Sequence, residues 1–107
     1  MTADPDRPDC LLTLALPAAL EQEALDLVLA EPGWVVDVSI AHVEALGEDV
    51  PLVTAMEKVR GRARRSQLTL VTHSAHVGPL TAAVAAAFPG THTLWWTTAL
   101  TGYGEAQ

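Results

Sequence analysis

The sequence contains one cysteine, few aromatic residues and few basic residues. Cys10 has no partner for an internal disulfide. Only 5% of the 107 residues are aromatic, so we expect a core built mainly from Leu, Val and Ala. The sequence has 6 Lys and Arg residues and 13 Asp and Glu residues, which gives a net charge of −7 at pH 7. This negative net charge argues against a general nucleic-acid-binding protein, because such proteins usually carry a positively charged surface that binds the phosphates.

Long apolar runs and catalytic motifs are missing as well. The sequence has no run of 18 or more apolar residues, so we expect no membrane insertion. Residues 1–9 are polar and rich in Pro, unlike a signal peptide, and we expect a disordered tail on a cytoplasmic protein. There is no nucleophile elbow, Walker loop, Cys-x-x-Cys pair or close carboxylate pair. We therefore expect a protein that is not an enzyme.

The apolar pattern predicts four strands and two helices. Alternating apolar residues indicate strands at 10–16, 34–44, 67–71 and 91–100. Apolar residues at helical spacing indicate one helix after Pro17 and another after Ser74, a candidate N-cap. Pro79 leaves two options for the second helix: a kinked first turn, or a start nearer Gly78.

This order of elements is typical of the ferredoxin-like βαββαβ arrangement, an α+β fold. We predict a four-stranded antiparallel sheet with both helices on one face, in a domain over residues 10–101 that is followed by a tail at 102–107. The other face of the sheet would be apolar, and we expect sister subunits to bury it. Its predicted residues are Leu11, Val35, Val71 and Trp95.

Five of the six basic residues lie in one short segment, residues 57–65. Four of them recur at every second position: Lys58, Arg60, Arg62 and Arg64. In an extended chain they would form one cationic row, whereas in a helix they would scatter, and Gly61 would weaken that helix. We therefore predict an extended ribbon that projects between strands two and three and binds an anion or docks on a partner. A solvated edge that prevents aggregation is the alternative.

Histidines and carboxylates supply candidate metal ligands. His73-x-x-His76 would place two imidazoles on one side of a helical turn, and Zn, Cu and Ni accept such ligands. His42 and Glu44 share one face of the second predicted strand, near its loop end. The remaining ligands would have to come from another strand or subunit. Exposed side chains without a metal are the simpler interpretation at both places.

The chain resembles the PII-like superfamily, the trimeric ferredoxin-like proteins related to nitrogen regulatory protein PII. The shared features are the β-α-β order, the loop inserted before strand three, and the end of the long second strand, Val43-Glu44-Ala45-Leu46-Gly47. Two further segments resemble a small branch that is often found beside heavy-metal efflux systems of the resistance-nodulation-division type. They are Glu57-x-Val59-x-Gly61-Arg62 and Ala86-Ala87-Phe88-Pro89-Gly90.

The resemblance implies a homotrimer that acts as a signalling or regulatory protein, linked to heavy-metal homeostasis, with a membrane efflux component as a candidate partner. PII proteins of the nitrogen-regulatory type bind ATP or ADP between subunits, with a Lys after the second helix and Arg residues after strand four. Here the segment Phe88–His92 lacks a Lys, and no basic residue follows Arg65. The tyrosine that those proteins uridylylate in the projecting loop is also missing, since the one tyrosine is Tyr103.

Three hypotheses for the function follow. In the first, a divalent transition metal (Zn, Cu or Ni) or another small ligand orders residues 47–65, which then dock on a partner. In the second, the arginines of that segment bind an adenine nucleotide. In the third, the protein is an assembly subunit that binds no small ligand.

Overall fold

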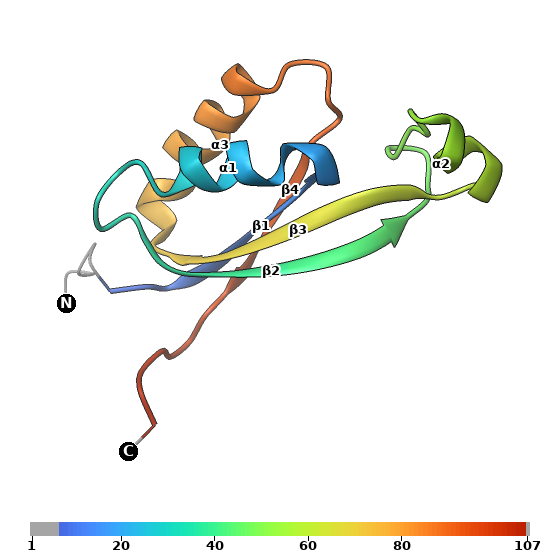
Figure 1. The fold of residues 1–107 in the computed structure, drawn as a ribbon. Helices are drawn as coiled ribbons and strands as arrows, with labels where there is room; N and C mark the ends of the chain where they lie inside the picture. Colours follow the sequence, from blue (N-terminus) through green and yellow to red (C-terminus); the bar gives the residue numbers. More distant parts are fainter. Residues whose placement is uncertain (1–6, 107) are drawn as a thin grey trace.

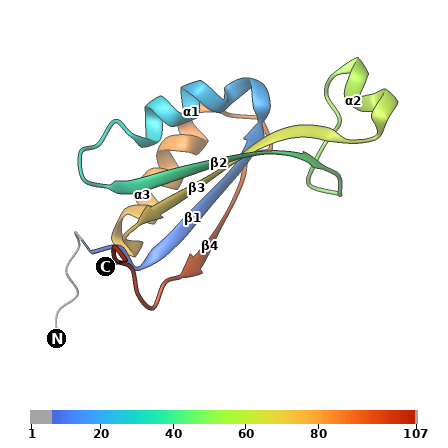
Figure 2. The ribbon, with the colours of Figure 1, turned by 60° about the horizontal axis from the view of Figure 1, so that its bottom comes forward.

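The computed structural model describes residues 7–106, which form one antiparallel sheet covered by two helices. The elements are β1 (Cys10–Pro17), the 3-10 helix η1 (Ala18–Leu20), α1 (Glu21–Val28), β2 (Val35–Ala45), α2 (Ala55–Arg60), β3 (Ala63–Thr72), α3 (Ser74–Ala87) and β4 (Leu94–Ala99). The strand order is β2-β3-β1-β4, and α1 and α3 lie on the same face (Figure 1). Figure 2 shows β2 and β4 at the two edges of the sheet. The predicted ferredoxin-like α+β fold is confirmed.

The core lies between this sheet and the two helices. Its residues alternate along β1 and β3 and recur at helical spacing in α1 and α3: Leu12, Leu14, Leu16, Leu68, Leu70, Ala24, Val28, Leu80 and Val84. The five leucines of the two strands have no exposed surface. Burying one such side chain contributes about 1.5–3 kcal/mol, so these residues supply most of the driving force for folding.

The two adjacent tryptophans of β4 lie on opposite faces of the sheet. Trp95 is opposite Leu14 and Trp96 is opposite Thr13 in the register with β1. Because side chains alternate along a strand, Trp95 lies on the helix side and Trp96 on the open face. The prediction of Trp95 for the open face was therefore wrong, because alternation alone cannot tell which of two adjacent tryptophans faces the core.

A bulge in β2 overturns a second prediction for the open face. The register of β2 against β3 shifts between Val35 and Asp37, so that Val35 pairs with Thr72 and packs against the core. The extra residue of a bulge reverses the alternation on one side of it, which the sequence pattern did not reveal. Leu11 and Val71, which are opposite each other on β1 and β3, do lie on the open face as predicted.

The hydrogen bonds of the sheet begin one residue earlier than the sequence pattern predicted. The N–H of Asp9 donates to the carbonyl of Thr72, and its carbonyl accepts from the N–H of Leu100, so Asp9 belongs to the sheet rather than to a disordered tail. Residues 1–6 of that predicted tail lie outside the described residues.

Helix α3 starts at Ser74, but its N-cap is His73, and Pro79 lies inside the helix, where it removes one helical hydrogen bond.

Residues 57–60 of the basic segment are helical, so the predicted extended ribbon was wrong there, whereas residues 63–65 are extended as the first part of β3. Thr54 and Glu57 form a capping box at the start of α2, and Gly61 ends the helix with a left-handed φ of 73°. Both are strong local signals for the limits of a helix. The four predicted cations consequently form no single row: Lys58 and Arg60 lie on α2, Arg62 in the following turn and Arg64 on β3.

Residues 46–62, the arm, project from the end of the sheet and away from α1 and α3 (Figure 1). The predicted projecting segment between strands two and three is thus confirmed.

Of the helices in the described part of the chain, none has the length and apolar character needed to cross a membrane.

Replacing Gly61 with Ala is expected to destabilise the arm by about 1 kcal/mol, because a left-handed backbone disfavours a Cβ atom. The N–H of Arg62, which donates to the carbonyl of Glu57, should then exchange with solvent about fivefold faster. Gly78 provides the control, because an added Cβ in α3 meets nothing within 4 Å and the backbone there is helical. Gly78→Ala should leave the arm unchanged and slightly raise the free energy of unfolding. Equal behaviour of the two variants would contradict the assigned role of Gly61.

Candidate ligand site at the base of the arm

Arg65 is a buried cation where the arm joins the sheet. Its side chain comes from β3 and only 3% of the residue is exposed. Its Nη1 donates to the carbonyl of Ala15 at 3.1 Å and to that of His92 at 3.0 Å. Among the described residues, Nε and Nη2 make no hydrogen bond and no carboxylate lies within ion-pair distance of the guanidinium.

The electrostatics of Arg65 favour an anionic partner. Burial lowers the pKa of Arg65, while the negative charge of Glu57 acts in the opposite direction. Within the described residues, His73 Nε2 is the one fully buried side-chain nitrogen or oxygen without a hydrogen bond, so the unbonded nitrogens of Arg65 keep contact with solvent and are open to a ligand. A guanidinium presents a planar fork that fits carboxylate and phosphate oxygens. Arg65 therefore has the chemistry of a site for a small anion.

The loop that Arg65 contacts forms one wall of a cavity of about 280 Å³. The other walls come from the end of α3 and from β4, and the cavity lies on the helix side of the sheet. Phe88 and Trp95 supply aromatic surface, and 53% of Trp95 is exposed. Thr91 and Thr93 add hydroxyl groups whose oxygens are 2.8 Å apart. Such a mixture of aromatic walls and a few polar groups is typical of small-molecule sites.

His92 in this loop has an unusual backbone. Its φ of 54° makes it the one non-glycine residue with a positive φ in the part of the chain that the structure describes. A non-glycine residue in this region costs of order 1–2 kcal/mol, and such strain is found preferentially at functional sites. The carbonyl of this residue is the group that Arg65 holds.

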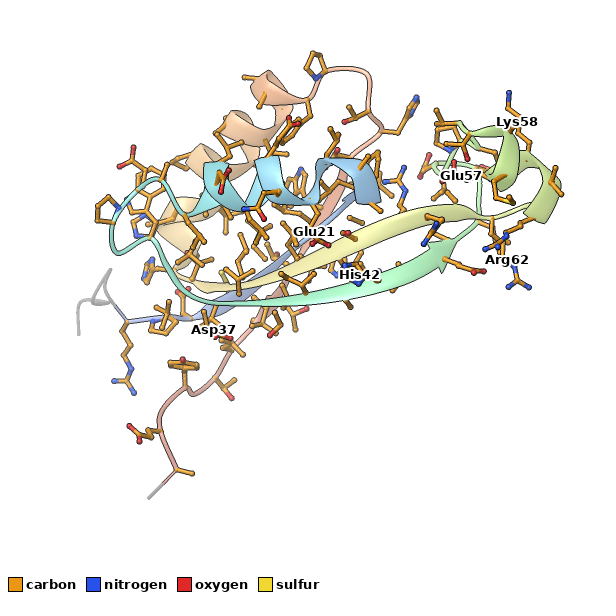
Figure 3. The ribbon with its side chains drawn as sticks, in the orientation of Figure 1. Glu21, Asp37, His42, Glu57, Lys58 and Arg62 are labelled. Atoms are coloured by element: carbon orange, nitrogen blue, oxygen red, sulfur yellow. The ribbon has the colours of Figure 1, made fainter. Side chains whose placement is uncertain are left out.

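The carboxylate of Glu57 holds the arm together. Its Oε1 accepts from the N–H groups of Val53 and Thr54, at 2.9 and 3.3 Å, and its Oε2 accepts from the N–H of Arg64 at 2.7 Å. Figure 3 shows Glu57 pointing into the arm, whereas Lys58 points away from it. The N–H groups of Val53 and Arg64 keep the pKa of Glu57 below its ordinary value of 4.5. One ionised side chain thus joins the start of α2 to the start of β3.

The predicted anion-binding residues are exposed and spread around the arm. Arg62 pairs with Glu44 at 2.9 Å, and both side chains are largely accessible to water. An exposed pair of this kind contributes little to stability. Lys58, Arg60 and Arg64 are also exposed. None of the four is buried as Arg65 is.

Glu21, Ser66 and His42 form a second polar cluster (Figure 3). Glu21 at the start of α1 accepts from the Ser66 hydroxyl at 2.7 Å and contacts His42 Nε2 at 2.6 Å, both through Oε1. The hydrogen bond from Ser66, followed by that from His42, lowers the pKa of Glu21. Ser66 is completely buried, so its hydroxyl is not accessible to a substrate. The cluster ties α1 to β2 and β3.

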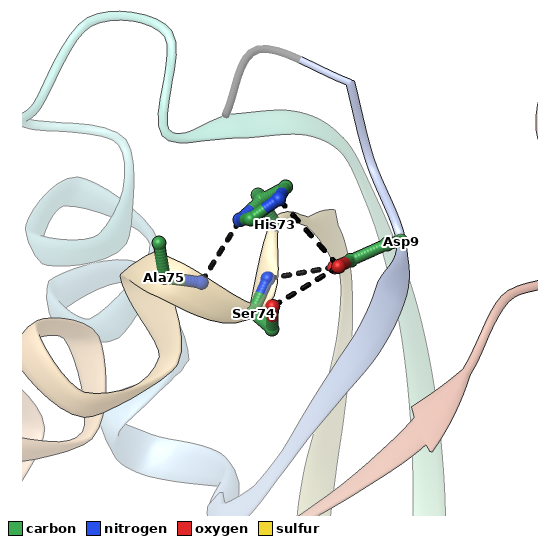
Figure 4. Close-up of polar contacts among 4 residues, drawn as sticks. All are labelled: Asp9, His73, Ser74 and Ala75. Carbon is green, nitrogen blue, oxygen red and sulfur yellow. Dashed lines mark hydrogen bonds and ion pairs between the residues drawn. The ribbon is translucent and has the colours of Figure 1, made fainter. Parts of the chain in front are cut away.

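His73 takes part in the capping of α3 (Figure 4). Its Nδ1 accepts from the N–H of Ala75 at 3.0 Å, so Nε2 carries the proton. Nε2 is buried and lies 3.5 Å from Asp9 Oδ2, but it makes no hydrogen bond within the described residues. The carboxylate of Asp9 accepts from the N–H and the hydroxyl of Ser74, and the N–H of Ser74 lowers the pKa of Asp9. A protonated Nε2 cannot ligate a metal. The Ser74 hydroxyl donates to Asp9 rather than to His73, so the three side chains do not form a catalytic relay.

The four residues predicted as metal ligands do not come together in one chain. His42 and Glu44 lie near the arm, on the part of β2 that pairs with Ser66 and Arg64, whereas His73 and His76 lie at the opposite end of β3. His76 stacks on Trp34 with ring centroids 4.9 Å apart. Residues 7–106 contain no group of three or more His, Cys, Asp or Glu side chains that could hold a metal ion. A metal site stays a prediction that needs ligands from a second chain.

Cys10 has the properties of an inert thiol. It is 6% exposed, and burial, followed by the charge of Asp9, raises the pKa of its thiol. A thiol with a raised pKa is a poor nucleophile and a poor metal ligand.

Sequence reasoning missed Arg65, Glu21 and the capping role of Glu57. The Thr54-x-x-Glu57 spacing could have identified the capping box. Arg65 lies in the basic segment, but it is not part of the alternating row and was therefore not predicted as a site residue. Nothing in the local sequence marks it as buried.

Solved structures of PII-like proteins share this fold. CPII, a nitrogen regulatory PII-like protein from Thiomonas intermedia K12 whose structure holds ADP, AMP and bicarbonate, superposes with a TM-score of 0.68 at 17% identity, over 92% of this chain and 97% of that one. A putative PII-like signaling protein from Thermus thermophilus gives a TM-score of 0.61 at 15% identity, over 88% of each chain. At such identities the likeness shows the fold alone. The PII-like fold implied by the resemblance is confirmed.

A comparison of the sequence with protein families shows which family the chain belongs to. The family described as "Protein of unknown function (DUF3240)" matches residues 7–107, so the chain belongs to the DUF3240 family. A DUF3240 family protein from Shewanella baltica OS155 has a similar crystal structure, with a TM-score of 0.74 at 12% identity, over 94% of this chain and 98% of that one. No curated protein matches the sequence.

Replacing Glu57 with Gln should loosen the arm, because an amide oxygen is a weaker acceptor than a carboxylate for the N–H groups of Val53 and Arg64. These two amides should exchange with solvent at least about tenfold faster in the variant, as measured by hydrogen exchange. Glu48→Gln is the matched control, since Glu48 is an exposed residue of the same arm.

The same contacts predict a pH dependence with a defined sign. The pKa of Glu57 is lower in the folded protein, so the stabilisation is present at neutral pH and disappears as the pH falls through that lowered value, below 4.5. In the Glu57→Gln protein, the protection of the Val53 and Arg64 amides, which is their exchange corrected for the intrinsic pH dependence of amide exchange, should lose this pH dependence. An unchanged pH profile in the variant would show that another group controls the arm.

Proposed function

We propose that this protein is a non-catalytic, trimeric regulator of the PII-like type, which binds an anionic small molecule beside Arg65 and presents its arm to a partner protein. The observation that carries the proposal is the buried guanidinium of Arg65, which has two hydrogen-bonded carbonyl groups on Nη1 and no carboxylate paired with it in the described chain. A ligand phosphate or carboxylate would supply the missing negative charge.

Arg65 is placed to couple a bound ligand to the arm. On one side its guanidinium holds the carbonyl of His92, in the loop that lines the cavity. On the other side its neighbour Arg64 donates its N–H to Glu57, which fixes the arm. A ligand that moves or orders Arg65 would therefore act on both the loop and the arm. Ordering a projecting segment on ligand binding is a recognised way to switch partner recognition.

An adenine nucleotide is the ligand class that we favour. The related fold of CPII is bound to ADP, AMP and bicarbonate. In this chain, Phe88 and Trp95 line the cavity, whereas Arg65 does not line it but holds the carbonyl of His92 in the loop that does, and from there it offers a cation for a phosphate. This assignment replaces the exposed arm arginines by Arg65 as the group that binds the anion. A divalent metal is less favoured, because the lone pair of His73 Nδ1 is already used by an N–H group.

The trimer and the cellular context belong to the same proposal. On the open face of the sheet, Leu11, Val71 and the half-exposed Trp96 lie among polar residues, which are Asp37, Ser39, Thr13, Thr69 and Thr98, so this face is mixed and the trimer rests mainly on the resemblance to PII-like proteins. The resemblance to the branch found beside heavy-metal efflux systems supports a cytoplasmic regulator of heavy-metal homeostasis, whose partner is a component of such a system.

Native mass spectrometry tests the proposal directly, with the protein alone and then with ADP, AMP, Zn²⁺ or Cu²⁺. We expect a trimer that gains the mass of ADP or AMP, with an affinity that falls as salt increases. Arg65→Lys keeps the positive charge but loses the planar fork, and it should weaken nucleotide binding roughly tenfold or more.

Arg60→Gln serves as the control, because Arg60 is an exposed cation of α2, and it should bind nucleotide as the wild type does. The melting temperature of each variant shows whether it is folded. A monomer, a trimer that gains metal but no nucleotide, or equal affinity of the Arg65→Lys and wild-type proteins would each contradict the proposal.

A further inference from the structure

The arm ends in an exposed apolar surface. Val53, Met56 and Val59 are 70%, 56% and 84% exposed, and all three lie on or just before the short helix α2. Met56 and Val59 are three residues apart, so they are neighbours on the surface of the helix. Single exposed apolar residues are common, but three within seven residues on a projecting element form a patch that calls for a partner.

Basic side chains accompany this patch. Lys58 and Arg60 lie on the same helix, are exposed, and have no ion-pair partner in the part of the chain that the structure describes. Residues 46–65 contain five of the 6 basic residues and three of the 13 acidic residues, whereas the rest of the protein is strongly acidic. Within the arm itself, three basic residues balance three acidic ones, so the positive charge of its end is local to Lys58 and Arg60. We call Val53, Met56 and Val59, together with Lys58 and Arg60, the tip surface.

We infer that the tip surface docks into an apolar groove with an acidic rim on a partner protein. The inference rests on the proposed function in one respect, namely that the arm is the part presented to a partner. The apolar side chains would enter the groove, and Lys58 and Arg60 would pair with carboxylates at its edge. Interfaces commonly have this arrangement, in which a few apolar anchors supply affinity and the surrounding charges supply specificity and speed of association.

The internal contacts of the arm fit this role. The capping box and the carboxylate of Glu57 hold α2 in shape without any contribution from the side chains of Val59 or Lys58. A preformed helix loses little conformational freedom on binding, which favours affinity. The tip residues are therefore available for recognition, since the fold of the arm does not depend on them.

The charge distribution favours a protein over the two other occupants. An anionic lipid surface would repel the acidic body of the molecule, and three apolar side chains at a six-residue helix bury too little area for stable insertion. Docking of the tip on the acidic body of a second copy would be a heterologous contact, which tends to build open-ended assemblies. A groove rimmed with Asp and Glu matches both the apolar and the basic part of the tip surface.

The test uses the full chain and a fluorescently labelled helical hairpin peptide of about 40 residues, whose two helices form a groove lined by Leu and Phe and rimmed by Glu. We expect saturable binding in fluorescence anisotropy that weakens with salt, and no binding of the same peptide with every Glu changed to Lys. The double variants Met56→Ser/Val59→Ser and Lys58→Gln/Arg60→Gln should each weaken binding roughly tenfold.

Matched controls come from outside the arm. Leu29→Ser removes an apolar side chain that is 53% exposed, and Arg7→Gln removes an exposed cation. Both should bind the peptide as the wild type does. Because the tip lies apart from Arg65, the tip variants should also bind ADP normally, so a failure of nucleotide binding and a failure of the tip surface remain distinguishable.

Three results would overturn the inference. The first is no binding of the acidic peptide, or binding that both tip variants retain. The second is that vesicles of phosphatidylglycerol and phosphatidylcholine bind the wild type, but not Met56→Ser/Val59→Ser, more tightly than the peptide does. The third is concentration-dependent association of trimers that the same variant abolishes, which would make a second copy of the chain the occupant.

Discussion

The carboxylate of Glu57 determines what the segment between β2 and β3 becomes. Three backbone N–H groups converge on it, two from just before α2 and one from the start of β3, so a stretch that alternation would extend is folded back into a short capped helix. Hydrogen bonds from neutral N–H groups to a charged acceptor are among the stronger ones in proteins. This one residue therefore turns a string of charged residues into an element with a defined surface.

The arm and the loop before β4 meet at Arg65. Its neighbour in sequence is bonded to Glu57, and its own guanidinium holds the carbonyl of His92. The backbone of His92 is left-handed, which indicates that the loop is held in a conformation it would not adopt alone. The proposed ligand would bind where these two elements are joined, which gives a physical route from occupancy of the site to the state of the arm.

Most of the fold could be predicted from the sequence, because it depends on periodicity. Leu12, Leu14 and Leu16 alternate as a core strand must, and the apolar residues of α1 and α3 recur at helical spacing. Predictions failed where a local structural feature interrupted the regular spacing of apolar or charged residues. The bulge beside Val35 reversed one face, and at residues 54–61 a capping box and a C-terminal Gly overruled the alternation of charge.

The candidate site could not be predicted in the same way. Arg65 is buried because carbonyl groups from Ala15 and His92, which are 50 and 27 residues away in the sequence, converge on it. No local pattern records such a contact. His73 shows the reverse case, since its spacing from His76 suggested metal ligands, while its ring is used to cap α3.

The most direct test of the central claim is hydrogen exchange of the arm amides with and without ADP, in the wild type and in Arg65→Lys. If Arg65 links the ligand to the arm, ADP should slow the exchange of the Val53, Thr54 and Arg64 amides in the wild type and leave it unchanged in the variant. Equal slowing in both proteins, or no effect of bound ADP on the arm, would contradict the account.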